Sequence, residues 1–333
     1  MAKKPPAKKN TAKKSPSKKA ARSSNAIAAV RRGPAMMGTA FAKSPEGAQV
    51  AFFGAPHGTP YKTIDNRPHA ASNDAIREAL KGDALWIDHW DFDFGSRVLP
   101  DEGFTAVDLG NLQTSPKDGK GNRRKIESCT KAILDAGAVP IMIGGDDSVP
   151  IPFLAGFAGG PPITIVQIDA HIDWREEREG EPMGFSSTMR RASEMSHVWR
   201  IVQAGARGIG SARQGEVDAA IGWGARIVPG NVFHREGIDS VLRHIEPEST
   251  CVISLDLDVL DSSVMPAVAY PSPGGMTFLQ LTSLIAGIAA KARIGGFAMV
   301  EFVAKKDLTG TAALTAGRVA MHVLHHVARQ TKK

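Results

Sequence analysis

The sequence predicts a single α/β domain, built on a mainly parallel sheet that helices cover on both faces. Apolar runs of strand length recur along the chain from about residue 48, and segments with helical spacing of apolar residues lie between them. In addition, a chain of 333 residues with 42% hydrophobic content can bury one large core. These observations favour one domain of three layers.

Each expected strand is a short run rich in branched, aromatic or other apolar residues. Nearly continuous runs of this kind are typical of strands buried on both faces of a parallel sheet. The expected strands are residues 49–55, 84–90, 104–108, 138–143, 163–168, 199–204, 251–257 and 296–302. Helices are expected where apolar residues recur every three or four positions, most clearly at 126–136, 238–245, 278–292 and 312–326.

Residues 1–32 differ from the rest of the chain in composition. They contain eight lysines and three arginines without any acid, whereas the whole chain has a net charge of +7. Lys-Lys pairs separated by Pro, Ala and Ser cannot bury an apolar face, so residues 1–32 are predicted to be a disordered, solvated tail. A nucleic-acid-binding protein is an alternative interpretation, but the tail has no aromatic residue, so no specific nucleic-acid partner is expected. The expected domain is therefore 33–333.

Several features favour a soluble protein of the cytoplasm. No run approaches the roughly 18 apolar residues of a spanning helix, and no signal-peptide pattern is visible, so no membrane partner is expected. The two cysteines, Cys129 and Cys251, fit a reducing compartment and form no metal-binding pattern.

Two of the expected strands end in acidic and imidazole side chains. Asp169, His171 and Asp173 follow strand 163–168, and Asp256 and Asp258 close strand 251–257. Because side chains along a strand alternate faces, each set points to one side. Strand-end acids can also cap helices or accept from loop amides, but carboxylates packed so closely would repel and raise each other's pKa values. A metal cation would relieve this repulsion, and we predict a metal site.

A third expected strand, 138–143, is followed by Gly-Gly-Asp-Asp-Ser at 144–148. The glycines permit a tight turn and a close approach of the backbone. Asp146 and Asp147 would add oxygen ligands or hydrogen-bond acceptors, although an Asp-rich turn that caps a helix is the alternative. Because ligands bind beyond the carboxyl ends of parallel strands, the position of this turn favours the site.

These three segments, in this order and at this spacing, resemble the signature segments of the ureohydrolase family, the arginases and agmatinases. The similarity extends to Asn-Arg-Pro at 66–68 with Ile-Arg at 76–77, to Pro-Ser-Pro-Gly-Gly at 271–275, and to Val-Glu-Phe at 300–302 with Asp307. It covers roughly residues 48–328 and is greatest to the agmatinase branch. The resemblance implies a three-layer α/β/α arginase-like ureohydrolase domain.

The resemblance also implies a binuclear-metal amidinohydrolase, which cleaves the guanidino C–N bond of a small guanidino compound and releases urea and an amine. Two Mn²⁺ ions per subunit are expected, with Ni²⁺ as the alternative, because oxygen ligands with one imidazole suit Mn²⁺ better than Zn²⁺. A pair of metals lowers the pKa of water towards neutrality. Homotrimers or homohexamers are usual among such proteins. The implied arrangement has Asp169 and Asp256 bridging the metals, His171 and Asp258 completing one of them, and Asp147 and Asp173 the other.

Glu301 resembles the family carboxylate that faces the guanidinium of the substrate, which it can hold in a bidentate fork. Glu301 and Asp173 are therefore the expected catalytic residues, and Glu301 and Ser272 the expected substrate-binding residues. The alternative for Glu301 is an acid at a strand end, paired with Lys305 or Lys306.

The chain departs from the family pattern at three positions. Asp147 stands where the commonest signature has a histidine, and Phe185 stands where many members carry a histidine for proton transfer. Ser272 removes a carboxylate close to the substrate, which makes agmatine itself a less expected substrate. Other histidines, such as His57 and His69, are predicted to be solvated or capping residues of a loop.

Two alternatives remain for the function. A degenerate subunit would keep the fold and pair with an active homologue; Asp147 and Phe185 favour it, and the retained ligands oppose it. Within the enzyme class, the alternative substrate is a biguanide of the metformin type or another alkylguanidine.

Overall fold

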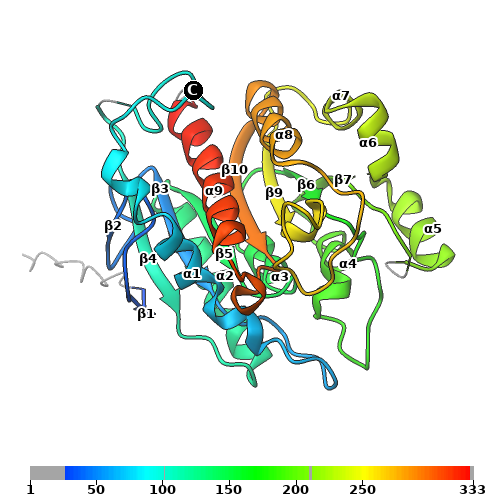
Figure 1. Cartoon of the computed structure of the whole chain (residues 1–333). Coiled ribbons are helices and arrows are strands. Elements are labelled where there is room, and N and C mark those ends of the chain that lie inside the picture. Colours follow the sequence, from blue (N-terminus) through cyan, green and yellow to red (C-terminus); the bar gives the residue numbers. More distant parts are fainter. Residues whose placement is uncertain (1–26, 101, 210–211, 331–333) are drawn as a thin grey trace, which may run out of the picture.

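The computed structural model describes residues 27–100, 102–209 and 212–330 of the chain. These residues form a ten-stranded sheet in the order β1-β4-β3-β5-β10-β9-β6-β7-β8, with β2 paired to β4 (Figure 1). Strand β1 runs antiparallel to β4, and the other pairs are parallel, as predicted. The strands are β1 (Ala29–Val30), β2 (Ala40–Phe41), β3 (Val50–Ala55), β4 (Ala106–Leu112), β5 (Val139–Gly144), β6 (Ile163–Ile168), β7 (Val198–Ala204), β8 (Arg226–Val228), β9 (Thr250–Asp256) and β10 (Arg293–Val300).

Helices connect most of these strands, and local sequence explains where several of them begin. The side chain of Asp118 accepts a hydrogen bond from Gly121 N at the start of α2, and Thr277 with Gln280 forms a capping box at the start of α8. No helix among the described residues has the length and apolar content needed to cross a membrane. The α-helices are α1 (Ser72–Ala79), α2 (Gly119–Asp135), α3 (Pro150–Ala155), α4 (Thr188–Ala192), α5 (Gln214–Trp223), α6 (Gly230–Glu236), α7 (Asp239–Leu242), α8 (Phe278–Lys291) and α9 (Thr311–Arg329), and the 3₁₀ helices are η1 (Arg67–Ala71), η2 (Asp83–Trp86), η3 (Phe185–Ser187), η4 (Leu257–Val259) and η5 (Ala304–Lys306).

Two apolar clusters, one on each face of the sheet, make the three layers. Neighbouring residues of a strand alternate between the clusters: Phe52 packs with residues of α1, α8 and α9, whereas Phe53 packs with residues of α2, α3 and α4. Figure 1 shows α1 and α9 in front of the sheet and α2 and α3 behind it. Because helices cover both faces, the central strands are apolar along their whole length, and only their ends are open to polar chemistry.

The expected strand at 84–90 is wrong. This segment begins as the 3₁₀ helix η2 and continues in turns, with local hydrogen bonds from Ala84 N to Leu80 O and from Leu85 N to Gly82 O. Its apolar residues do not enter the core, since Leu85 is 76% and Trp86 59% exposed. The segment is therefore apolar in composition but is not buried as a strand of this sheet must be. The expected helix at 238–245 is also shorter, at Asp239–Leu242.

The predicted basic tail, residues 1–32, extends too far towards the C-terminus, because its last residues are part of the folded domain. Residues Ala29 and Val30 form β1 and pair with Leu112 and Asn111 of β4, so the end of the segment 1–32 belongs to the sheet. Two-residue strands such as β1 and β2 are too short to leave an apolar pattern in the sequence. Residues 1–26, which hold most of the predicted tail, lie outside the described residues.

Candidate metal centre

The acidic motifs meet at the carboxyl edge of the sheet, on four strands that are neighbours in it. Strands β5, β10, β9 and β6 lie side by side in this order. Asp147 lies in the turn after β5, Glu301 follows β10, Asp256 ends β9, and Asp169 follows β6. Parallel strands thus bring segments far apart in the sequence to one edge, where ligands bind in sheets of this type.

Six side chains form two overlapping groups that could each hold a metal ion. In each group the possible ligand atoms lie within 4.8 Å of one another. Asp169 belongs to both groups, whereas Asp256 lies in the group of His171. The groups are Asp169, His171, Asp256 and Asp258, and Asp147, Asp169 and Asp173.

The charges of these groups fit bound cations. Burial raises the pKa values of Asp147, Asp173 and Asp256 well above the usual range of an aspartate, and the neighbouring carboxylates raise them further. Asp147 Oδ2 is buried and has no hydrogen-bond partner among the described residues. A buried carboxylate without a partner is costly unless a cation meets it. A donor set of carboxylates with one imidazole suits hard divalent cations such as Mn²⁺.

His171 lies between two of the carboxylates. Its Nδ1 is 3.0 Å from Asp258 Oδ2 and 3.5 Å from Asp169 Oδ1. Burial opposes a charge on the imidazole, but the two carboxylates outweigh burial and raise the pKa of His171 to about 12. A metal ion would take the place of this proton, because histidine binds metals in its neutral form.

Gln167 orients two of the carboxylates, and the sequence reasoning missed it. Its Nε2 donates to Asp169 Oδ2 and to Asp173 Oδ2, both at 2.8 Å. Gln203 on β7 donates in turn to Gln167 Oε1 at 2.5 Å and to Ile172 O at 2.8 Å. A signal was present, because Gln167 is a polar residue within an apolar strand and shares a face with Asp169. Such a partner fixes the direction in which a ligand points.

Glu301 is held from two sides. Its Oε1 accepts from Asp147 N at 2.8 Å, and its Oε2 is 3.1 Å from His69 Nε2. Burial alone would lower the pKa of His69, but the neighbouring Glu301 raises it to about 9. The predicted alternative, a pair of Glu301 with a lysine, is not seen, since Lys306 donates to main-chain carbonyls. The expectation that His69 is a solvated or capping residue is wrong, because it is buried against Glu301; His57 instead contacts Thr114 Oγ1 at 2.9 Å.

A cavity of about 440 Å³ opens above these residues. Its floor is formed by Glu301 and by every carboxylate of the two ligand groups except Asp169. Ser272, Tyr270 and Phe185 contribute to its walls. Phe185 contacts Tyr61 edge to face, with ring centroids 4.9 Å apart, and lies 6.1 Å from Tyr270. Glu301 and Ser272, the expected substrate-binding residues, therefore line the same cavity as Phe185, which stands where many family members have a histidine.

Arg207 joins η4, the 3₁₀ helix that follows β9, to the loop of Ser272. Its Nη2 donates to Asp258 O at 2.7 Å and to Ser272 O at 2.8 Å, and its Nε donates to Pro273 O at 3.2 Å. No motif in the sequence marks Arg207. Its role becomes visible only when β7 and the loop 271–275 are brought together in the fold.

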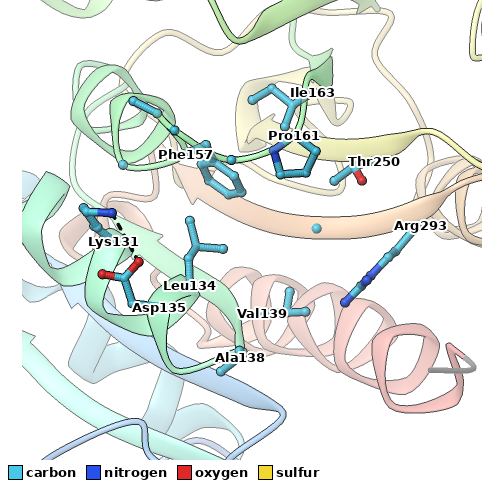
Figure 2. Close-up of a pocket in the computed structure, with 16 residues that line it drawn as sticks. Lys131, Leu134, Asp135, Ala138, Val139, Phe157, Pro161, Ile163, Thr250 and Arg293 are labelled. Atoms are coloured by element: carbon cyan, nitrogen blue, oxygen red, sulfur yellow. Dashed lines mark hydrogen bonds and ion pairs between the residues drawn. The ribbon is translucent and has the colours of Figure 1, made fainter. Parts of the chain in front are cut away.

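A second cavity, of about 320 Å³, lies at the opposite edge of the sheet (Figure 2). Residues at the starts of strands line it, among them Val139, Ile163, Thr250 and Arg293. Lys131 Nζ lies 3.2 Å from Asp135 Oδ1 there, so this acid has a partner within the chain. The cavity contains none of the residues of the two ligand groups, and the carboxyl edge is the candidate site.

Comparison with known proteins agrees with this assignment. Residues 48–326 match the arginase family. A guanidinopropionase from Pseudomonas aeruginosa is 30% identical over 69% of this chain and 73% of its own, and an N(1)-aminopropylagmatine ureohydrolase from Thermococcus kodakarensis is 29% identical over 76% and 83%. The solved structure of proclavaminate amidinohydrolase from Streptomyces clavuligerus has the same fold, with a TM-score of 0.77 over 90% of this chain and 99% of that chain at 24% identity. The chain therefore belongs to the arginase family, whose members are metal-dependent hydrolases of guanidino C–N bonds.

Proposed function

We propose that this chain is a binuclear-metal amidinohydrolase that cleaves a small guanidino compound into urea and an amine, as an agmatinase does. The observation that carries the proposal is the pair of ligand groups that share Asp169 beneath a cavity of about 440 Å³. The names of the relatives, a guanidinopropionase and an aminopropylagmatine ureohydrolase, support a guanidino substrate.

The proposed cofactor is a pair of Mn²⁺ ions, with Ni²⁺ as the alternative. Asp169 would be shared, and we keep the expectation that Asp256 is shared as well. When bound, the metals would supply a water with a lowered pKa for attack on the guanidino carbon. The proposed ligands are Asp147, Asp169, His171, Asp173, Asp256 and Asp258.

Glu301 is the proposed partner of the substrate guanidinium. A carboxylate has about four acceptor positions, so Glu301 can accept from the substrate in addition to its bonds with His69 and Asp147 N. Since Asp173 Oδ2 accepts from Gln167, its other oxygen would carry the proton that the leaving amine needs. Ser272, in the cavity wall, would contact the substrate through its hydroxyl.

A second candidate is a degenerate subunit that pairs with an active homologue. Phe185 favours it, because this aromatic ring packs against Tyr61 where many members of the family carry a proton-transferring histidine. The retained acids at the floor of the cavity oppose it. A biguanide of the metformin type, or another alkylguanidine, remains the alternative substrate for an active enzyme.

The proposed assembly is a homotrimer or homohexamer in the cytoplasm, or a hetero-oligomer with a homologous subunit. Leu85, Trp86, Trp90 and Phe92 support an assembly, because these large apolar residues are exposed on one short segment of the surface. Light scattering coupled to size-exclusion chromatography would test it, and a monomer at micromolar concentration would contradict it.

The function is tested by reconstituting the purified protein separately with Mn²⁺ and Ni²⁺ and measuring urea. The panel is agmatine, guanidinobutyrate, guanidinopropionate, arginine, guanidine and metformin. We expect metal-dependent urea release from at least one guanidino compound. If none of them is cleaved by the metal-loaded protein, the degenerate subunit becomes the better account.

A further inference from the structure

One side of the cavity mouth carries a positively charged group in a defined position. Arg178 lines the cavity, and its guanidinium carbon lies 5.4 Å from the centroid of the Tyr61 ring and 5.7 Å from that of Phe185. These two rings contact each other edge to face. A guanidinium close to two aromatic rings is held by cation–π attraction, which does not use its N–H donors.

The loop that carries Arg178 is itself fastened. Arg178 and Glu181 exchange two main-chain hydrogen bonds, at 3.2 and 3.0 Å, around a tight turn. The carboxylate of Glu179 in this turn accepts from Thr63 N at 3.0 Å and from the Thr63 hydroxyl at 2.5 Å. The position of Arg178 is therefore tied to the loop that also carries Tyr61.

The donors of Arg178 remain available for a ligand. Among the described residues its nearest carboxylate is Glu179, at 3.8 Å from Nε, and that carboxylate is already engaged by Thr63. The side chain of Arg178 is 34% exposed and lines the cavity, so a ligand that enters from solvent can reach it. An arginine fork in this state is suited to a planar carboxylate, which it binds with two parallel hydrogen bonds.

The cavity as a whole has two poles of opposite charge. Every acid that lines it belongs to the floor: Asp147, Asp173, Asp256, Asp258 and Glu301. The cations among its lining residues, apart from His171, are Arg175 and Arg178. A substrate with a guanidinium at one end and a carboxylate at the other would match both poles, whereas the terminal ammonium of agmatine would meet a like charge at the mouth.

We infer that Arg178 determines specificity by binding a carboxylate at the tail of the substrate, so that the chain prefers ω-guanidino carboxylic acids over guanidino compounds with a cationic or neutral tail. The inference rests on the proposed function, because it assumes that the guanidinium lies at the floor. It assigns Arg178 to recognition of the tail and gives it no part in the cleavage.

The test compares three compounds of similar length on the metal-loaded protein: 4-guanidinobutyrate, agmatine and butylguanidine. We expect kcat/KM to be highest for 4-guanidinobutyrate. Arg178→Gln should lower it for this acid by at least ~10-fold, chiefly through KM, because a hydrogen bond between charged groups is lost. In the same variant, kcat/KM for butylguanidine should stay within about twofold of the wild-type value, since that substrate has no carboxylate. Arg178→Glu should turn the preference towards agmatine.

Arg190→Gln is the matched control. Arg190 has a similar exposure, 30%, but it pairs with Glu176 and Glu194 and does not line the cavity. This variant should keep the wild-type preference.

The outcomes separate the two proposals. A lack of urea from every compound would count against the proposed function alone, because titration calorimetry of 4-guanidinobutyrate on wild type and Arg178→Gln still tests the inference. Equal affinity of the two proteins would overturn it. Cleavage of agmatine or butylguanidine as efficient as that of the acid would overturn the inference and leave the amidinohydrolase proposal standing.

Discussion

The buried carboxylate of Asp108 on β4 and the cluster of buried carboxylates at the carboxyl edge of the same sheet are balanced in different ways. Asp108 on β4 is fully buried, and Arg77 on α1 meets it with two hydrogen bonds, Nε to Oδ2 at 2.7 Å and Nη2 to Oδ1 at 2.9 Å. Met36 N and Gly110 N donate to the same carboxylate, at 3.0 and 2.8 Å. The chain therefore supplies both the cation and the donors that this acid needs.

Among the described residues, no arginine or lysine side chain pairs in this way with the acids of the two ligand groups at the carboxyl edge. The group around Asp169 has the imidazole of His171, and the nearby Arg207 donates to main-chain carbonyls. Asp147 Oδ2 has no hydrogen-bond partner among the described residues. Burial of a carboxylate is thus no sign of a site in itself. Burial of several carboxylates around a single imidazole is the sign, because one protein cation does not offset their repulsion and a further cation from outside is needed.

The largest effect is expected where the chain supplies its own cation. Arg77→Met should reduce the free energy of unfolding by about 3–5 kcal/mol, because it leaves Asp108 buried without its partner. Denaturant unfolding measures this loss. Arg67→Gln is the control, because Arg67 forms an exposed pair with Asp65 and should change stability little. A loss as small in Arg77→Met as in the control would show that Asp108 does not depend on Arg77.

Glu301 is intermediate between Asp108, which an arginine pairs fully, and the acids of the cluster, because His69 balances part of its charge. Glu301→Gln should leave the metal content intact and cost at least ~2 kcal/mol of transition-state binding, the value of a lost charge-assisted contact with the guanidinium. Steady-state kinetics with metal analysis of the same samples measures both quantities. Wild-type kcat/KM in this variant would remove Glu301 from the mechanism.

Replacing an aspartate by asparagine should change the free energy of unfolding in opposite directions at the carboxyl edge and at β4. Asp147→Asn should stabilise the chelator-treated protein, because it removes a buried acid whose charge is opposed by burial and by the neighbouring carboxylates. Asp108→Asn should destabilise the protein instead, since it leaves the buried Arg77 with only the half-exposed Asp74, 3.7 Å away, as a counter-charge. Denaturant unfolding of the two variants gives the comparison. Destabilisation by both would mean that the cluster is balanced within the protein.

The smallest effect concerns pH. The pKa of His69 rises from 6.5 to about 9 on folding, so its pair with Glu301 contributes fully below pH 6.5 and its contribution is lost as the pH rises through about 9. The difference in unfolding free energy between wild type and His69→Gln should therefore shrink over this range. A difference that stays constant from pH 6 to pH 10 would contradict a charged pair.

The sequence predicted most of this arrangement, because period-2 alternation and apolar strands determine which acids gather at one edge. Asp169, His171, Asp256 and Asp258 could be placed together in this way. The sequence could not predict contacts between distant elements. His69 reaches Glu301 from the 3₁₀ helix η1, and Arg178 is positioned by the rings of Tyr61 and Phe185, which are far apart in the sequence. The prediction of a strand at 84–90 is wrong because apolar composition is not by itself a sign of burial, and Leu85, Trp86 and Trp90 lie on the surface.

The central claim is that the unbalanced acids hold two metal ions, and metal content tests it most directly. Protein purified without chelator, loaded with Mn²⁺ and freed of excess metal, should contain about two ions per chain by mass spectrometry, as a two-metal site requires. Asp169→Asn, which alters the residue common to both ligand groups, should lose most of this metal, whereas Asp135→Asn at the other edge should lose none. Well under one equivalent in the loaded wild type would contradict the account.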